Sequence, residues 1–218
     1  MRKIEAVLFD LDGTLVDSNN IIIDSFRHVM TAFFPERLWS RKNIMEMIGP
    51  PLYDTFKKYT SSEEMISDMI FAYRKYYVEN EFDSISLYPG VKETLTELKN
   101  KNCRLGVVTT KFRVSALPSL EHFGLDKLFE EIVSLDEITH AKPHPEPVLY
   151  ALKQLKCHFG IMVGDHPSDI VSGKAAGIAT CAVDWSLKRK ELELSSPDYW
   201  IKDFRQLIKI VDDINKEE

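Results

Sequence analysis

The sequence predicts an α/β fold whose mostly parallel sheet is covered by helices on both faces, with an all-helical segment inserted near the N-terminus. Short apolar runs rich in β-branched residues recur along the chain. From residue 88 onward, these runs alternate with longer segments whose apolar residues follow the helical period. Residues 17–85 interrupt this alternation, because they contain helical stripes and no convincing strand.

Five apolar runs are expected to form the strands of the sheet. They occupy residues 6–9, 105–108, 132–133, 161–163 and 178–183. Several are uniformly apolar, which is typical of central strands that are buried on both faces. Helical segments separate the later runs, and the first of these segments is marked by Val91, Leu95 and Leu98. Alternating strands and helices predict a parallel sheet.

The inserted segment is expected to be a separate helical domain. Its apolar residues form two stripes at helical spacing: Ile22, Phe26, Val29 and Phe33, then Met65, Met69, Tyr73 and Tyr77. We interpret the stripes as the core of this domain rather than as a ligand site. Residues 17–85 are therefore assigned to the helical domain, and residues 1–16 together with 86–218 to the core that contains the sheet.

The charge balance of the chain excludes one class of partner. The 218 residues include 28 basic and 34 acidic side chains, which gives a formal net charge of −6, and lysine and arginine form no long cluster. We therefore expect no nucleic-acid partner. If the substrate is an anion, a local cation must offset the negative charge, and a bound metal ion is the natural candidate.

The sequence also predicts a cytoplasmic protein. Cys103, Cys157 and Cys181 are widely spaced and odd in number, which favours free thiols and a reducing compartment. The apolar run at residues 6–9 is too short for a signal peptide or a membrane span, and no later stretch qualifies. We expect no membrane association, and either a monomer or a weak dimer.

Three of the expected strands end in residues that are able to bind phosphate or metal. The first is followed by Asp10-Leu11-Asp12-Gly13-Thr14, the second by Thr109-Thr110-Lys111, and a later one by Gly164-Asp165-His166-Pro167-Ser168-Asp169. In an open parallel sheet, ligands bind at the carboxyl ends of the strands, so these ends converge on one crevice if the strands are neighbours. Lys142, in a loop stiffened by prolines, is the fourth contributor.

The acidic residues at these strand ends predict a magnesium site. Asp10, Asp12, Asp165 and Asp169 would bring several negative charges within a few ångströms of one another. At an effective dielectric constant of about 20, each pair ~4 Å apart would repel by about 4 kcal/mol. Either some of these carboxyl groups are protonated or a hard cation lies among them. Oxygen ligands that leave room for water and a substrate phosphate favour Mg²⁺.

The same residues can carry a phosphoryl transfer. With the metal bound, Asp10 stays ionised and can attack phosphorus. Thr109 can donate a hydrogen bond, and Lys142 can supply a positive charge, to a developing phosphoryl oxygen. Asp12 could protonate the leaving oxygen and then deprotonate water. Gly13 would let the chain turn sharply between these groups.

Each of these residues alone also has an ordinary structural explanation. Aspartates at strand ends often form turns, and Lys142 could be a solvated surface charge. Asp169 could cap a helix that begins at Ile170. The joint occurrence of these residues, in this order and at strand ends, favours the catalytic interpretation.

The quoted motifs resemble those of the haloacid dehalogenase superfamily along nearly the whole chain. The resemblance rests on the Asp10-x-Asp12-Gly13-Thr14 motif, the strand-end hydroxyl of Thr109, Lys142 before a proline, and the pair Asp165 and Asp169. It implies a Rossmann-like core and an inserted helical cap of the C1 type. It also implies that Mg²⁺ is held by Asp10, Asp165, the backbone carbonyl of Asp12 and, directly or through water, Asp169.

Within the superfamily, shorter stretches resemble the inorganic pyrophosphatases of Gram-positive bacteria and, next, the phosphoglycolate phosphatases. These stretches are residues 48–56, 107–111 and 139–143. Two positions depart from the common pattern, because Thr110 stands where many relatives have asparagine, and His166-Pro167 stands where small polar residues are usual. His166 could contact the outer shell of the metal or pack at the rim of the site, and we favour the rim.

Substrate recognition is expected to involve residues from both domains. Gly49 and Pro50, in a loop between helices of the inserted domain, are candidates to face the site, since a lid must recognise the leaving group and exclude water. Lys111 is the candidate cation for the distal phosphate of pyrophosphate, although a solvent-facing lysine is an equal alternative. Gly13 and Thr110 complete the predicted substrate-binding set.

These observations predict a Mg²⁺-dependent phosphohydrolase that acts through an aspartyl-phosphate intermediate on a small phosphorylated substrate, with inorganic pyrophosphate as the expected one. The alternatives are a phosphatase of phosphoglycolate or another small phosphomonoester, a sugar-phosphate mutase, and a phospho-receiver signalling domain. Receivers are about half as long and lack the inserted domain. A dehalogenase would not need Asp12 or the metal-binding carboxylates, and a non-catalytic binding module would show no turnover.

Overall fold

The computed structural model of the chain describes residues 3–216 and divides into two compact units. One unit comprises Met1–Val16 with Leu87–Glu218, and the other comprises Asp17–Ser86. The chain crosses between them at the short strands β2 (Val16–Asp17) and β3 (Ser86–Leu87), which form a two-stranded sheet. The assignment of these units as catalytic core and substrate cap stays a prediction.

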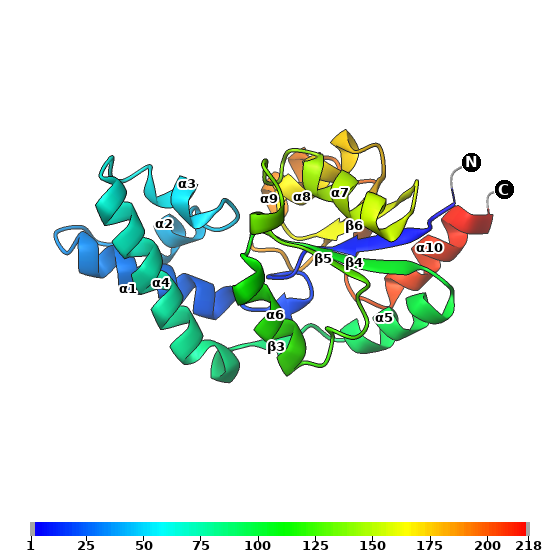
Figure 1. Cartoon of the computed structure of the whole chain (residues 1–218), viewed down its shortest axis with the longest axis horizontal. Coiled ribbons are helices and arrows are strands. Elements are labelled where there is room, and N and C mark those ends of the chain that lie inside the picture. The colour runs from blue at the N-terminus through cyan, green and yellow to red at the C-terminus, as the bar shows by residue number, and fades with distance from the viewer. Residues whose placement is uncertain (1–2, 217–218) are drawn as a thin grey trace. The chain divides into compact units, whose positions relative to one another are not determined.

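The larger unit is built on a six-stranded sheet of parallel pairs (Figure 1). Its strand order is β5-β4-β1-β6-β7-β8. The strands are β1 (Ala6–Phe9), β4 (Arg104–Val108), β5 (Glu131–Val133), β6 (Gly160–Gly164), β7 (Ala179–Val183) and β8 (Tyr199–Ile201). The predicted parallel sheet is confirmed, and all five predicted strands are present within two residues of their expected bounds.

Helices cover both faces of this sheet, with α7 and α8 on one face and α5 and α10 on the other (Figure 1). The helices of the unit are α5 (Val91–Asn100), α6 (Arg113–His122), α7 (Glu146–Leu155), α8 (Pro167–Ala175), α9 (Arg189–Leu194) and α10 (Gln206–Lys216), with a 3₁₀ turn at Leu135–Glu137. This two-sided cover explains the uniformly apolar strand sequences.

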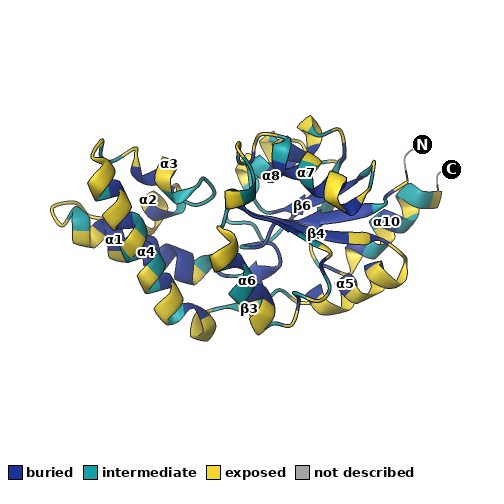
Figure 2. Cartoon of the chain, in the orientation of Figure 1, coloured by how far each residue is buried: buried dark blue, intermediate teal, exposed yellow. Residues whose placement is uncertain are grey.

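Strand β1 illustrates how the sheet forms the core, because its side chains alternate between the faces. Ala6 and Leu8 belong to the hydrophobic cluster that includes residues of α7. On the other face, Phe9 stacks on Phe204 with ring centroids 6.0 Å apart. All four residues of β1 are fully buried, as Figure 2 shows for the interior of the sheet. Both faces of this central strand are therefore apolar up to Asp10.

One strand of the sheet is missing from the sequence prediction. Strand β8 lies at the edge, pairs only with β7, and has only one fully buried residue, Ile201. Its position depends on Asp198, whose carboxylate accepts hydrogen bonds from the Thr180 amide at 2.8 Å and hydroxyl at 2.7 Å. A short edge strand without a continuous apolar run resembles a loop in sequence, which is why the prediction missed it.

Between β2 and β3, the regular structure of the smaller unit consists of helices, as the apolar stripes predict. These are α1 (Asn19–Phe33), α2 (Arg41–Met45), α3 (Leu52–Phe56) and α4 (Glu63–Ser84). Phe26 packs against Phe56 and Tyr73, with ring centroids 5.8 and 4.8 Å away. The stripes are therefore this unit's own core, although Phe33 and Met65 at their ends are only partly buried. Among residues 3–216, no helix is both long and apolar enough to cross a bilayer.

Candidate active site

The three strands whose ends carry the predicted polar residues are neighbours in the sheet. Strand β1 lies between β4 and β6, so Asp10, Thr109 and Asp165 follow adjacent strands on the same edge. The amide of Asp10 donates to the Val163 carbonyl at 2.9 Å, which continues the ladder one residue beyond β1. The predicted convergence of these strand ends is confirmed.

Lys142 links two of the aspartates at the centre of this edge. Its ammonium donates to Asp10 Oδ1 at 2.7 Å, to Asp169 Oδ1 at 2.6 Å and to the Val108 carbonyl at 2.7 Å. These three acceptors use all three hydrogens of an ammonium group. Only 2% of the Lys142 side chain is exposed, so the lysine is part of the interior and not a solvated surface charge.

Asp165 completes a compact group of three carboxylates. One oxygen each from Asp10, Asp165 and Asp169 lies within 4.8 Å of the others. Asp165 also accepts a hydrogen bond from the Thr14 hydroxyl at 3.3 Å. If all three are ionised, the single charge of Lys142 leaves an excess of two negative charges in a buried space. Three oxygen donors with that excess charge fit a hard divalent cation.

The acid–base properties of the group reflect this crowding. Burial raises the pKa of Asp10 to about 7, against the lowering effect of Lys142. Burial, then the charges of Asp10 and Asp169, raise the pKa of Asp165 well above its usual range. Burial alone would lower the pKa of Lys142, but the two adjacent carboxylates outweigh it and hold the pKa above its ordinary value. Lys142 is therefore charged, while the three carboxylates have too little positive charge near them to balance their own.

Two glycines allow these carboxylates to approach the backbone. Gly13 has a φ of +81°, and a Cβ at this position would overlap with the Asp165 carboxylate. A Cβ at Gly164 would overlap with the side chain of Asp169. Both carboxylates thus occupy the volume that a side chain would fill, and the glycines are required for their positions.

Asp12 does not join the three-carboxylate group but forms an ion pair beside it. Lys111 Nζ lies 3.2 Å from the Asp12 carboxylate, and each side chain is about one-sixth exposed. The Lys111 amide donates to the Thr109 hydroxyl oxygen at 3.1 Å, which leaves the hydroxyl hydrogen able to point to a ligand. Lys111 is therefore mostly buried beside Asp12, and its contact with a substrate stays a prediction.

Asp169 does take part in capping, but the helix begins three residues earlier than expected. Helix α8 begins at Pro167 and has His166 at its N-cap, so Asp169 lies in the first turn and not at the cap. Asp169 Oδ2 accepts from the His166 amide at 2.9 Å, while Oδ1 accepts from Lys142. The His166 ring contacts Ser168, whose hydroxyl lies 2.8 Å from His166 Nδ1. Burial lowers the pKa of His166 to about 4, so its ring is neutral near pH 7.

Two residues that were not predicted from the sequence hold the loops that follow β1 and β6. Trp185 Nε1 donates to the Gly13 carbonyl at 3.0 Å, and the Ser186 hydroxyl donates to the Asp165 carbonyl at 2.5 Å. Both follow β7, so the rule that polar residues gather at the carboxyl ends of strands could have found them. Thr110 lies beside Thr109 and is half-buried. Gly49 and Pro50 belong to the helical unit, and their contact with a substrate stays a prediction.

Comparison with known proteins indicates the family to which the chain belongs. A family model described as haloacid dehalogenase-like hydrolase matches residues 7–183. The pyrophosphatase PpaX of Bacillus cereus is 40% identical over 217 residues, which cover 98% of this chain and 99% of that protein. The PpaX of Oceanobacillus iheyensis is 42% identical over 214 residues, which cover 97% and 98%.

Solved structures agree with this placement. A predicted phosphoglycolate phosphatase from Haemophilus somnus is 29% identical, with a TM-score of 0.83 over 96% of this chain and 99% of that one. A haloacid dehalogenase-like hydrolase from Streptococcus pneumoniae is 27% identical, with a TM-score of 0.81 over 95% and 98%. From the family match and the full-length relatives, we conclude that the chain belongs to the haloacid dehalogenase-like hydrolases.

Proposed function

We propose that the protein hydrolyses inorganic pyrophosphate to phosphate, with Mg²⁺ as cofactor and an aspartyl-phosphate on Asp10 as intermediate. The observation that carries this proposal is the buried Lys142, bonded to both Asp10 and Asp169, with the Asp165 carboxylate beside them. The similarity to PpaX proteins over the full chain supports pyrophosphate as the substrate.

In the first half of the reaction, a carboxylate oxygen of Asp10 attacks one phosphorus atom of pyrophosphate. A bond between that oxygen and phosphorus forms while the bridging P–O bond breaks. Asp12, two residues along the loop, donates its proton to the departing phosphate oxygen. Lys142 keeps Asp10 oriented through its 2.7 Å hydrogen bond, which reduces the motion needed to reach the attacking geometry.

In the second half, water hydrolyses the aspartyl-phosphate. The Asp12 carboxylate takes a proton from the water as it attacks phosphorus, the bond to Asp10 breaks, and a second phosphate is released. The Thr109 hydroxyl is the group that donates a hydrogen bond to the transferred phosphoryl oxygens. Lys142, whose three hydrogens are used by protein acceptors, stabilises them through its positive charge.

Asp10, Asp165 and Asp169 are the residues that would hold Mg²⁺, together with the Asp12 carbonyl that the family resemblance implies. When bound, the ion would supply the positive charge that offsets the carboxylates and a phosphoryl oxygen. The chain's own contribution is to prepare the ligands: Gly13 and Gly164 make room for two of them, and the Thr14 hydroxyl and His166 amide orient them.

Lys111 is the residue that favours a charged leaving group. Its ammonium lies 3.2 Å from Asp12, so it is close to the group that protonates the departing oxygen. A departing phosphate carries more negative charge than the alcohol released from a simple monoester, and a cation at this position stabilises that charge. We assign Lys111 to the leaving phosphate of pyrophosphate.

The second candidate activity is hydrolysis of phosphoglycolate. The likeness to the predicted phosphoglycolate phosphatase from Haemophilus somnus, at 29% identity and a TM-score of 0.83, favours it over other monoesters. Phosphoglycolate has a carboxylate on its leaving group, which Lys111 could also meet. The chemistry at phosphorus would be the same, and only the leaving group would differ.

A phosphate-release assay with purified protein tests the proposal. Pyrophosphate, phosphoglycolate and a set of sugar phosphates are compared at equal concentration, with Mg²⁺ and with excess chelator. We expect the highest kcat/KM for pyrophosphate, with two phosphates formed for each pyrophosphate consumed and no turnover with chelator. A higher kcat/KM for phosphoglycolate would select the second candidate, and substrate isomerisation without phosphate release would indicate a mutase.

The proposed location is the cytosol. The three cysteines are free in the structure, and burial raises the pKa of each thiol, most strongly for Cys181. Protonated thiols without a disulfide partner suit a reducing compartment. Detection of the protein in a soluble, reducing cell fraction is the corresponding measurement.

A further inference from the structure

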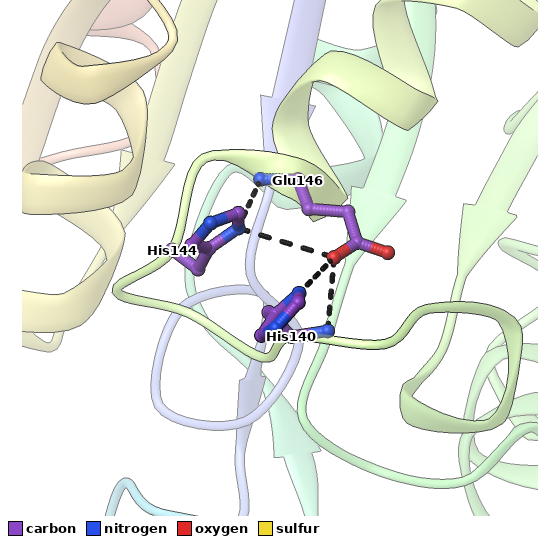
Figure 3. Close-up of side chains that lie close together, drawn as sticks. All are labelled: His140, His144 and Glu146. Carbon is purple, nitrogen blue, oxygen red and sulfur yellow. Dashed lines mark hydrogen bonds and ion pairs between the residues drawn. The ribbon is translucent and has the colours of Figure 1, made fainter.

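A second group of possible metal ligands lies on the loop that carries Lys142. His140 and His144 flank this lysine in the sequence, and Glu146 follows at the start of α7. One ligand atom from each of the three lies within 4.8 Å of the others. Figure 3 shows the two imidazole rings and the carboxylate gathered at one side of the loop. The mechanism proposed above uses none of these three side chains.

The distances among these side chains suit a shared ion. His140 Nδ1 lies 2.8 Å, and His144 Nδ1 3.9 Å, from Glu146 Oε2 (Figure 3). Two ligands about 2.05 Å from a tetrahedral metal ion are separated by about 3.3 Å, a value between these two distances. The imidazole rings lie 4.6 Å apart, centroid to centroid. Both rings are at least half-exposed, so rotations about their side-chain bonds can close the remaining difference. For His144, binding through Nδ1 replaces the hydrogen bond that this atom accepts from the Glu146 amide at 3.2 Å.

Backbone hydrogen bonds already hold Glu146 in position for this role. Its Oε1 accepts from the Thr139 amide at 2.8 Å, and its Oε2 from the His140 amide at 3.0 Å. These bonds lower the pKa of Glu146, together with the contact to the His140 ring, so the carboxylate is ionised. A carboxylate has about four lone-pair positions, and the two amides leave some of them for another ligand.

We propose that His140, His144 and Glu146 bind a divalent transition-metal ion of the Zn²⁺ class. Two imidazole nitrogens and one carboxylate oxygen are donors that such ions prefer, whereas Mg²⁺ prefers oxygen ligands alone. Three protein ligands leave a position for water. The donor set therefore selects a different kind of ion from the three aspartates, and the two sites can be distinguished by metal type.

This site would connect metal binding to the catalytic loop. The ligands lie two residues before and two and four residues after Lys142, whose ammonium reaches Asp10 and Asp169. The far side of the loop is fixed by Ser172 of α8, whose hydroxyl donates to the His144 carbonyl at 2.8 Å. An ion bound by all three ligands would hold the loop at both flanks of the lysine, and so stabilise the folded chain.

Equilibrium dialysis with Zn²⁺ tests the proposal on the full chain in a large excess of Mg²⁺. Wild-type protein is compared with the double variant His140→Ala/His144→Ala and with His158→Ala, which removes an exposed histidine outside the cluster. Zn²⁺ that binds the aspartates contributes equally to all three proteins. We expect wild type and His158→Ala to bind one more equivalent than the double variant.

Two further readouts separate the site from nonspecific binding. Each single histidine variant should weaken Zn²⁺ binding by about tenfold or more, because it removes one of only three protein ligands. Zn²⁺ should raise the midpoint temperature of thermal unfolding of wild type and of His158→Ala. The rise should be smaller for the double variant. Equal Zn²⁺ stoichiometry and affinity in wild type and the double variant would overturn the proposal. Because these readouts measure binding and stability, they do not depend on the pyrophosphatase assignment.

Discussion

Lys142 determines the charge balance of the site at the scale of single residues. Its ammonium lies between two carboxylates in the interior, where bulk water hardly screens its charge. Burying an isolated ion costs several kcal/mol, and the cost is offset only where opposite charges and hydrogen bonds surround it. Lys142 and its aspartates stabilise one another in this way, so neither partner can be removed alone without consequence.

Replacing Lys142 with methionine should reduce both stability and activity. The variant leaves Asp10 and Asp169 without their cation, so the free energy of unfolding at neutral pH should fall by about 3–5 kcal/mol without Mg²⁺. Denaturant unfolding checks this, with Lys153→Met, an exposed lysine of α7, as the matched control. The double variant Lys142→Met/Asp169→Asn should recover part of the loss. An unchanged free energy of unfolding in Lys142→Met would contradict the ion-pair account.

Asp10 is the predicted nucleophile, and its substitution has a specific expected outcome. Asp10→Asn keeps the shape of the side chain but removes the attacking carboxylate, so kcat should fall by at least ~10³-fold while the circular dichroism spectrum is retained. Asp213→Asn, at an exposed position of α10, is the matched control and should keep full activity. Substantial turnover by Asp10→Asn would remove Asp10 as the nucleophile.

The pairing of Lys111 with Asp12 predicts a change in selectivity. Lys111→Gln removes the cation near the departing group, so kcat/KM for pyrophosphate should fall by about tenfold or more. For a monoester that releases an uncharged alcohol, such as glycerol 2-phosphate, the loss should be much smaller. Comparing the two substrates under identical conditions measures the effect. Equal losses for both substrates would show that Lys111 acts on Asp12 alone and not on the leaving group.

At the scale of elements, the loops after the strands depend on glycine. The loop after β1 turns at Gly13, where the backbone has a positive φ and the Asp165 carboxylate fills the space of a side chain. The loop after β6 is similar, because Gly164 makes room for Asp169. The Asp165 and Asp169 carboxylates can come close enough to share the proposed ion because Gly13 and Gly164 have no Cβ.

A pair of glycine variants separates backbone strain from displacement of the carboxylate. Gly13→Ala combines an unfavourable φ with an overlap at Asp165, whereas Gly124→Ala has a φ of +66° and meets nothing within 4 Å. Both variants should lose about 1 kcal/mol of stability from backbone strain. Only Gly13→Ala should also weaken Mg²⁺ binding, measured as the Mg²⁺ concentration for half-maximal activity. Equal Mg²⁺ requirements in the two variants would contradict the role of Gly13.

Helix α8 shows that one residue can serve both the element and the site. Asp169 accepts a hydrogen bond from the His166 amide at the first turn and another from the Lys142 ammonium. The first bond stabilises the helix start, where backbone amides lack partners. The second fixes the carboxylate toward the active site. From sequence alone, capping and catalysis are alternatives for Asp169, whereas in the folded chain one side chain makes both the capping contact and the contact to Lys142.

At the scale of the whole molecule, the buried carboxylates make the stability of the folded chain depend on pH and, if they hold the proposed ion, on metal. Burial raises the pKa values of Asp10 and Asp165 in the metal-free folded state, so this state binds more protons than the unfolded chain. The stability from these groups is therefore present below their ordinary pKa near 4 and is lost as pH rises toward about 7. The proposed Mg²⁺ would bind the ionised carboxylates and should restore the loss.

Removal of the metal should therefore matter more at higher pH. The gain in free energy of unfolding on adding Mg²⁺ should increase as pH rises from about 5 to about 8. Denaturant unfolding with Mg²⁺ and with chelator, at several pH values, measures this gain. Asp165→Asn should reduce it across the range. A gain that is independent of pH would contradict the raised pKa values of the aspartates in the metal-free protein.

Much of the architecture was predictable from local sequence. Strands β1, β4, β6 and β7 are buried on both faces, so their apolar runs are uninterrupted, and the polar residues that follow them are conspicuous. The helical unit was predictable because its core residues recur at helical spacing. Edge strand β8 was not, since its side chains are only partly buried and its position depends on a contact between Asp198 and Thr180.

The sequence by itself determined the order of strands and helices, the inserted helical segment and the chemical types of the strand-end residues. These follow from burial patterns within short segments of chain. Only the tertiary structure decided that β1 lies between β4 and β6, that Lys142 contacts Asp10 across 132 residues, and that Asp12 pairs with Lys111. Such contacts join residues far apart in the chain, and their distances depend on strand order and loop path, which no local pattern contains.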